Sequence, residues 1–299
     1  MRVGFIGLGN LGGVLAPHIA AGGFEVAGYD ILPARLRALG RRGVRPARSA
    51  EEAARGARFV FLCLPTEAAV EGALRGPRGV LAGLGRGAIV ADLGTVLPAT
   101  SRRLARFVKE AGGRFLDTPI SGNRSISAQK GGTVMAGGAA ADYKRILPVL
   151  RSFSRAQYRM GPVGAGVLMK IVMNTVSELN RTVLAEGLTL GMRGGIAGRR
   201  LLEVLASGTA HSKQLDNKGP RMIAGRFGRP DSALAISIKD AELMLQTGRD
   251  VGAPLPLTAL RLLLYQAAAQ MGHAGDDPAS VIAFYQKMAG RPRRRSRRK

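Results

Sequence analysis

Lys170 and Asn174 are the two residues whose types and spacing point most directly to chemistry. They lie four positions apart in a segment with helical periodicity, so both side chains project from one face of a helix. Apolar residues occupy the other faces, and burying a lysine among them is costly unless its charge is paired or used. A lysine whose pKa is lowered by burial can act as a general acid or base near neutral pH. On spacing alone, a lysine that reaches solvent and pairs with a carboxylate explains the pattern equally well.

A second constellation, Gly7-Leu8-Gly9-Asn10-Leu11-Gly12, indicates a dinucleotide site because it follows an apolar run and opens a helical stretch. The first glycine permits a tight turn, the second lets the backbone approach a pyrophosphate, and the third lets helix and strand pack closely. The N-terminus of the following helix offers N–H groups and a partial positive charge to the phosphates.

Asp30 ends the second apolar run, 18 positions beyond Gly12. A carboxylate at this spacing accepts hydrogen bonds from the ribose hydroxyls of NAD and repels the 2′-phosphate of NADP. Ile31 follows it, where an arginine would favour that phosphate. Arg35 could turn toward that phosphate, although a solvated position on a helix explains Arg35 better. We therefore expect NAD as the cofactor, with NADP less favoured.

The elements that must position these residues follow from the apolar pattern. Short apolar runs alternate with helical stretches such as 51–56 and 97–111, which predicts an α/β Rossmann-type fold with a doubly wound parallel sheet. The predicted strands are residues 3–6, 24–29, 59–64, 88–91, 114–116 and 133–136.

The pattern changes after Gly161, and no further strand is predicted. Residues 165–193 are expected to form one long helix, because apolar residues recur at three- and four-residue spacings. Further helices are predicted at 198–207, 232–251, 256–272 and 278–288. We therefore predict a dinucleotide-binding domain at 1–162, an all-helical substrate and dimerisation domain at 163–290, and a disordered basic tail at 291–299.

Composition excludes several classes of protein. The only cysteine, Cys63, lies in an apolar run, which excludes a disulfide framework and favours an inert buried thiol in a reducing compartment. Nothing after Arg2 resembles a signal peptide, and no apolar run approaches the roughly 20 residues of a membrane span. We expect a soluble, cytoplasmic protein with no metal site and no membrane partner.

The net charge of +25 raises the question of nucleic-acid binding, since 45 basic residues face 20 acidic ones. Basic residues crowd the tail, but aromatic residues make up only 5% of the chain and are not interleaved with them. A solvated arginine-rich surface is therefore the favoured interpretation, and a nucleic-acid partner is not expected.

Across residues 4–288 the chain resembles the β-hydroxyacid dehydrogenases, the family of 3-hydroxyisobutyrate dehydrogenase and tartronate semialdehyde reductase. Four motifs carry the resemblance in the family's order. They are Gly4-Phe5-Ile6-Gly7-Leu8-Gly9-Asn10-Leu11-Gly12, Asp117-Thr118-Pro119-Ile120-Ser121-Gly122, Gly164-Ala165-Gly166 with Lys170 and Asn174, and Lys239-Asp240.

The resemblance implies a role for each matching residue. Lys170 would be the general acid and base at the substrate hydroxyl, and its charge would stabilise a developing alkoxide. Asn174 would hold the substrate or the lysine in register. Ser121 and Gly122 would bind the substrate carboxylate.

The same resemblance implies further contacts to the cofactor. Leu64, Pro65 and Thr95 would line the nicotinamide half of its site. Lys239 would reach the cofactor from the second domain, although pairing with Asp240 or Glu242 is an alternative.

The chain departs from the family at the substrate loop, which usually has a second glycine where this sequence has Asn123. A side chain that can hydrogen-bond thus replaces a close backbone approach, and residues 124–132 are about two longer than usual. Arg124 could bind a second acidic group or face solvent. His211-Ser212 lies where family members shape substrate choice, although a structural or surface role is more common for such a histidine.

The sequence therefore predicts an NAD(P)-dependent oxidoreductase that interconverts a small 3-hydroxyacid, similar to 3-hydroxyisobutyrate, and its semialdehyde. A homodimer or homotetramer is expected, as in the family. One alternative is an imine reductase, which shares the architecture but generally lacks the lysine at position 170. Another is a non-catalytic nucleic-acid-associated module, favoured by the charge and disfavoured by the intact Lys170 and Asn174.

Overall fold

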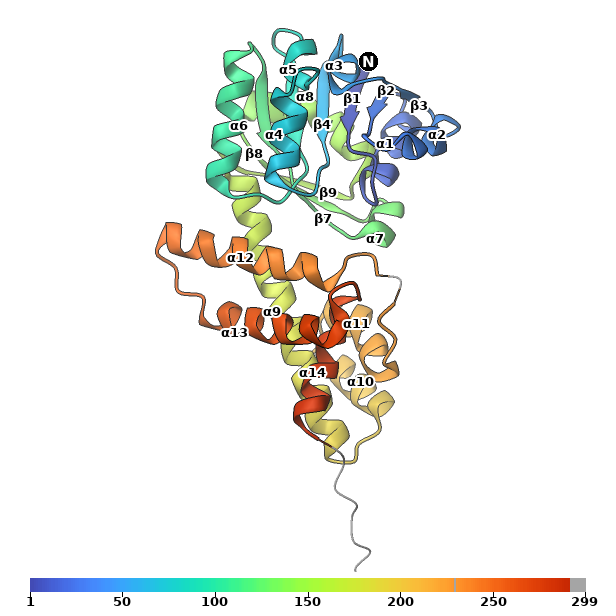
Figure 1. The fold of residues 1–299 in the computed structure, drawn as a ribbon, viewed down its shortest axis with the longest axis vertical. Coiled ribbons are helices and arrows are strands. Elements are labelled where there is room, and N and C mark those ends of the chain that lie inside the picture. The colour runs from blue at the N-terminus through green and yellow to red at the C-terminus, as the bar shows by residue number, and fades with distance from the viewer. Residues whose placement is uncertain (229, 291–299) are drawn as a thin grey trace, which may run out of the picture. The chain divides into compact units, whose positions relative to one another are not determined.

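The computed structural model describes residues 1–228 and 230–290, which fall into two compact units divided between Ile171 and Val172 (Figure 1). The division lies inside α9 (Ala165–Arg193), a helix of 29 residues that contributes to both units. The boundary at residue 162 that the sequence suggests lies just before this helix. The predicted basic tail at 291–299 lies outside the described residues.

The first unit is built on one sheet with the strand order β3-β2-β1-β4-β5-β6-β8-β7, and β9 pairs with β8. Its strands are β1 (Arg2–Ile6), β2 (Glu25–Tyr29), β3 (Val44–Pro46), β4 (Phe59–Leu62), β5 (Ile89–Asp92), β6 (Arg114–Asp117), β7 (Ile120–Ser121), β8 (Thr133–Gly137) and β9 (Ala156–Gly161).

The order of the strands reverses beside β1, because the chain first builds outward through β2 and β3 and then returns to place β4 on the other side. Strands β1 to β6 are parallel, as the sequence predicts. Strand β8 runs antiparallel to β6 and β7, which the prediction of a purely parallel sheet missed. Ligands of doubly wound sheets bind at the carboxyl ends of strands where the order reverses. A ligand is therefore expected at the carboxyl ends of the neighbouring strands β1 and β4.

Helices cover both faces of this sheet (Figure 1). Side chains alternate along each strand, so Phe59 and Phe61 of β4 join the core on one face while Val60 and Leu62 join the core on the other. This double burial explains why the strands are continuous apolar runs. The helices are α1 (Gly12–Ala21), α2 (Pro33–Gly40), α3 (Ala50–Ala54), α4 (Glu67–Arg75), α5 (Val80–Gly83), α6 (Pro98–Glu110), α7 (Arg124–Ala128) and α8 (Ala140–Phe153).

The second unit is helical, as predicted. It combines the C-terminal part of α9 with α10 (Gly198–Ser207), α11 (Lys213–Ala224), α12 (Leu234–Val251), α13 (Pro256–Ala268), the π-helical turn η1 (Ala269–His273), the 3₁₀ turn η2 (Pro278–Ser280) and α14 (Val281–Met288). Its core includes Leu184 and Leu188 of α9 and Tyr265 of α13.

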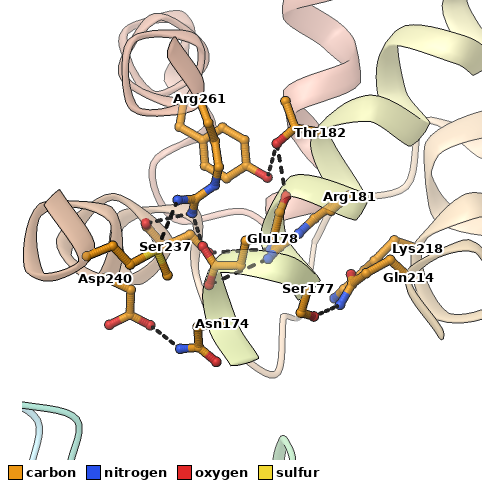
Figure 2. A network of polar contacts seen from close by, with 12 residues as sticks. Asn174, Ser177, Glu178, Arg181, Thr182, Gln214, Lys218, Ser237, Asp240 and Arg261 are labelled. Carbon is orange, nitrogen blue, oxygen red and sulfur yellow. Dashed lines mark hydrogen bonds and ion pairs between the residues drawn. The ribbon is translucent and has the colours of Figure 1, made fainter. Parts of the chain in front are cut away.

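A buried ionic network ties α9, α12 and α13 together beside this core (Figure 2). Arg261 of α13 is 1% exposed; it pairs with Glu178 of α9 and donates to the Ser237 carbonyl of α12 at 2.9 Å. Its guanidinium also lies 4.5 Å from the centre of the Tyr265 ring. Removing one partner of such a pair would leave an uncompensated charge in the interior, so the contact fixes how these three helices pack.

Several elements differ from the sequence-based prediction. Helix α11 was missed because it is polar and contains Pro220, although Ser212 caps its start and Gly225 ends it in a left-handed conformation. The short strands β3 and β7 and the partly exposed β9 also lack a clear apolar pattern. The helix predicted at 256–272 ends as α13 at Ala268 and continues as η1, where Gly272 has a φ of 97°.

Two buried carboxylates end neighbouring strands of the sheet. Asp92 of β5 and Asp117 of β6 are adjacent in register, and both are 0% exposed. Asp92 Oδ1 accepts from the Gly94 N–H at 2.9 Å, while Oδ2 has no hydrogen-bond partner within the described chain. Burial is the main cause that raises the pKa of Asp92 to about 7.

This pKa predicts a specific pH dependence of stability. The folded protein retains a proton on Asp92 that the unfolded chain releases near its ordinary pKa of 3.8, so the wild type should lose stability as pH rises from about 4 to 7. Asp92→Asn keeps an oxygen for Gly94 but carries no titrating group. We expect the melting temperature of the variant minus that of the wild type to increase between pH 5 and pH 8. A difference that stays constant across this range would contradict the prediction.

Candidate active site

The glycine-rich loop lies where the strand order reverses, directly after β1, and each glycine is required for a different reason. Gly7 has a φ of 91°, and a Cβ there would lie 2.4 Å from the Cys63 carbonyl oxygen. A Cβ on Gly12 would lie 1.9 Å from the Gly7 carbonyl oxygen, so α1 packs on the loop at a distance that only glycine allows. A Cβ on Gly9 would meet only the Arg35 guanidinium, at 3.6 Å, among the described residues.

Gly9 therefore leaves open a surface that a side chain would occupy, and α1 begins beside it without a side-chain cap from its N-cap residue, Leu11. An open backbone next to an uncapped helix N-terminus suits a pyrophosphate, so these residues fit a dinucleotide. Leu8 is buried and packs in the sheet core, whereas Asn10 is exposed.

Asp30 follows β2 and binds the glycine-rich loop itself. Its Oδ2 accepts from the Leu8 N–H at 2.7 Å, and Oδ1 accepts from the Leu32 N–H at 2.9 Å. The half-exposed Arg35 approaches the carboxylate at 3.2 Å. Asp30 thus anchors the loop as well as standing where a ribose is expected, and Arg35 is oriented toward the site and pairs with it, where the sequence favoured a purely solvated position.

The residues expected beside the nicotinamide lie at the ends of β4 and β5. Leu64 is half-buried and Pro65 is exposed after β4, while Thr95 is half-buried after β5. Cys63 precedes them, and burial raises the pKa of its thiol to about 12. Such a thiol stays protonated at neutral pH, in agreement with the inert role that the sequence suggests.

The loop after β6, which the sequence predicts to bind substrate, is shaped by a helix cap. Ser121 ends β7, and Gly122 has a φ of 148°, with Gly132, Ile126 and Ser127 close around the position of a Cβ. Asn123 Oδ1 accepts from the Ile126 N–H at 2.9 Å and so begins α7. The departure from the family's second glycine is therefore explained locally, since the asparagine oxygen caps a short helix and only the amide nitrogen remains for a ligand.

Lys170 is half-buried in the second turn of α9, within the first unit. The start of this helix is held by Asp117, whose Oδ1 accepts from the Gly164 N–H and whose Oδ2 accepts from the Val167 N–H, both at 2.8 Å. The sequence placed Asp117 in the substrate motif without a role of its own. The signal that could have revealed it is the lack of any capping side chain at 161–164.

Asn174 lies one turn further along α9, in the second unit, where Asp240 of α12 holds it (Figure 2). Its Nδ2 donates to Asp240 Oδ2 at 3.4 Å, and Asp240 Oδ1 lies 3.0 Å from Lys239 Nζ. Asp240 therefore brings together two residues that the sequence singled out separately. The pairing of Lys239 with Asp240 is the alternative contact that the sequence left open.

The remaining polar residues of interest have local structural partners. His211 Nε2 lies 2.9 Å from Asp216 Oδ1, and Ser212 caps α11 by accepting from the Leu215 N–H. Arg124 is exposed at the start of α7. The described residues include no group of three or more His, Cys, Asp or Glu side chains that could hold a metal, and none of the described helices is long and apolar enough to cross a membrane.

The geometry of the loop predicts that two glycine substitutions have separable effects. Gly9→Ala should weaken NADH binding by about tenfold or more and leave the melting temperature almost unchanged, because the new methyl makes only an ordinary contact with the Arg35 guanidinium. Gly12→Ala should weaken NADH binding and also lower the melting temperature, because its methyl collides with the Gly7 carbonyl. Gly40→Ala, where a Cβ meets nothing within 4 Å, is the control. Unchanged NADH binding by Gly9→Ala, measured by fluorescence titration, would argue against a cofactor at this loop.

Comparisons with known proteins agree with this geometry. Residues 2–163 match the family model described as the NAD binding domain of 6-phosphogluconate dehydrogenase, and residues 164–285 match the one described as NAD-binding of NADP-dependent 3-hydroxyisobutyrate dehydrogenase. The chain is 29% identical to 2-(hydroxymethyl)glutarate dehydrogenase of Eubacterium barkeri, over 97% of this chain and 96% of that protein. It is 30% identical to L-threonate dehydrogenase of Cupriavidus necator, over 95% of this chain and 96% of that protein.

A solved structure is also similar over the full length. The 3-hydroxyisobutyrate dehydrogenase from Salmonella typhimurium has a TM-score of 0.86 and 28% sequence identity, covering 95% of this chain and 99% of that one. With the dinucleotide fold, the helical second unit and both family models, these matches establish that the chain belongs to the β-hydroxyacid dehydrogenase family of NAD(P)-dependent oxidoreductases.

Proposed function

We propose that this protein interconverts a small 3-hydroxyacid, similar to 3-hydroxyisobutyrate, and its semialdehyde, with Lys170 as the general acid and base. The observation that carries the proposal is Lys170 itself, half-buried on α9, in the unit that carries the dinucleotide loop, and one helical turn beyond a helix start fixed to the sheet.

The proposed chemistry divides the reaction between cofactor and protein. The nicotinamide supplies or accepts the hydride when the cofactor is bound. In the oxidation, Lys170 Nζ takes the proton of the substrate hydroxyl as the substrate carbon loses its hydride, and in the reduction the ammonium returns a proton to the carbonyl oxygen. The positive charge also stabilises oxygen as it gains negative charge, which is often worth a few kcal/mol.

Binding and orientation are assigned to neighbouring residues. Ser121 and Gly122 offer a hydroxyl and a backbone N–H to the substrate carboxylate, and the amide nitrogen of Asn123 is a further donor at the same loop. Asn174, oriented by Asp240, holds the substrate or Lys170 in register. Lys239 is proposed to reach the cofactor. A small acid with one carboxylate suits this set of donors.

A homodimer or homotetramer is proposed as the assembly. Support comes from large apolar side chains that are exposed on α9 and α13 of the single chain. They include Val176, Val183, Leu190, Leu257, Leu260 and Leu263. A cytoplasmic location and the absence of a nucleic-acid partner remain part of the same proposal.

Replacing Lys170 provides the direct test. Lys170→Ala should lower kcat for the preferred hydroxyacid by several orders of magnitude and leave the Kd of NADH nearly unchanged, because the lysine acts on the reacting oxygen. Turnover is measured over a panel of 3-hydroxyacids with both cofactors, and cyclic imines are included because imine reductases share this fold. A variant with near-full turnover, or a wild type that reduces imines and no semialdehyde, would overturn the assignment.

Cofactor choice is tested separately. Because the Asp30 carboxylate repels a 2′-phosphate, we expect kcat/KM to be at least about tenfold higher with NAD than with NADP. Arg35→Ala should preserve or increase this ratio, because Arg35 offsets the charge of Asp30. A clear preference for NADP that disappears in Arg35→Ala would show that Arg35 binds the phosphate and would refute the proposed NAD preference.

A further inference from the structure

The start of α9 has no capping side chain in the residues just before it. A helix N-terminus leaves four N–H groups without partners inside the helix, and Ser, Thr, Asp or Asn side chains just before the helix usually accept from them. Here the preceding residues are Gly161-Pro162-Val163-Gly164, none of which carries an acceptor in its side chain. The acceptor comes from Asp117 instead, 47 residues before Gly164 and 50 before Val167.

The Asp117 carboxylate uses both of its oxygens for this purpose in a space with no room for side chains. A Cβ on Gly137 would lie 2.4 Å from Oδ1, and a Cβ on Gly166 would lie 2.8 Å from Oδ2 and 2.4 Å from the Met135 carbonyl oxygen. The first turn of α9 thus touches the backbone of β6 and β8 directly. A negative charge at the positive end of the helix dipole strengthens the contact.

Asp117 is connected to both the loop with Ser121 and the helix with Lys170. Asp117 begins the segment that leads to Ser121 and Gly122, four and five residues later, and its side chain holds the turn that precedes Lys170. Lys170 is three residues after Val167, about one helical turn from the clamped N–H. A shift of the first turn would therefore move Lys170 with it and leave the substrate loop in place.

We propose that Asp117 is a positioning residue whose carboxylate clamps the start of α9 and thereby sets the place of Lys170 relative to the substrate loop. Asp117 does not bind substrate, since it is 0% exposed and both oxygens are occupied by α9. The inference rests on the proposed function insofar as Lys170 is the acid and base, but the clamp itself is a property of the fold.

Asp117→Asn in the full-length protein is the main test. The amide keeps one acceptor and turns N–H groups toward the other helix N–H, so one hydrogen bond is replaced by a repulsive contact. We expect kcat per active site to fall by about 10²-fold, the effect of misplacing a catalytic group by about 1 Å, while the Kd of NADH changes by less than about twofold. The pH profile of kcat should also shift, because the surroundings of Lys170 change.

Asp142→Asn is the matched control. Asp142 is another buried carboxylate of the same unit, 4% exposed on α8, but its partners are Arg114 and Arg145 and not α9. This variant should lose stability and keep both kcat per active site and its pH profile. If Asp117→Asn behaves in the same way, Asp117 has only a structural role and the proposal is overturned.

Hydrogen–deuterium exchange supplies a readout that does not depend on activity. In Asp117→Asn the amides of residues 164–171 should exchange faster, while those of α8 keep the wild-type rate. If exchange at 164–171 becomes faster in Asp117→Asn but the wild type is inactive on every hydroxyacid, the proposed function is refuted and the structural role of Asp117 at the start of α9 is still supported. Unchanged exchange at 164–171 would overturn the clamp. Should Asp117→Asn fail to fold, Gly166→Ala, which pushes the helix off an intact Asp117, should show the same signature.

Discussion

Two helices, α1 and α9, begin in direct contact with the backbone of a strand or of the loop that follows one, at distances that exclude any side chain. At α1 the contact joins Gly12 to the Gly7 carbonyl, and at α9 it joins Gly166 to the Met135 carbonyl. The same steric device therefore places the loop expected to hold the cofactor and the helix that carries the proposed proton donor. Both depend on backbone atoms, whose positions vary less than those of flexible side chains. The rest of the unit, with apolar cores on both faces of the sheet, keeps these two contacts in place.

The two helices solve the problem of their free N–H groups differently. The N-cap residue of α1, Leu11, has no hydrogen-bond acceptor in its side chain, and the open backbone beside Gly9 is suited to an anionic ligand. The start of α9 is filled by Asp117, so that position is closed to a ligand. One N-terminus is thus suited to binding and the other to support. Burial raises the pKa of Asp117, and the N–H groups of Gly164 and Val167 oppose that effect by stabilising the ionised form.

Much of this arrangement could be predicted from the sequence, and the remainder has identifiable causes. The apolar runs revealed the main strands, and the long helix at 165–193 was predicted with its observed ends, because burial leaves a clear periodic signal. Helix α11 gave no such signal, although its cap at Ser212 was visible in the sequence. The cap by Asn123 is also local and could have been recognised. For Asp117 the sequence showed only that residues 161–164 lack a capping side chain; it did not show which residue supplies the acceptor, because Asp117 lies about 50 residues from its partners and becomes their neighbour only after the sheet forms.

The unreactive thiol of Cys63 has a practical consequence for physical study of this enzyme. It is the only cysteine of the chain, and with a pKa of about 12 it is almost entirely in the unreactive thiol form at neutral pH. The wild-type protein is therefore already a suitable background for attaching one spectroscopic label. A cysteine introduced at an exposed position outside the proposed subunit interface, such as Lys109 near the end of α6, would react selectively, and the fluorescence or spin signal would report from one known site.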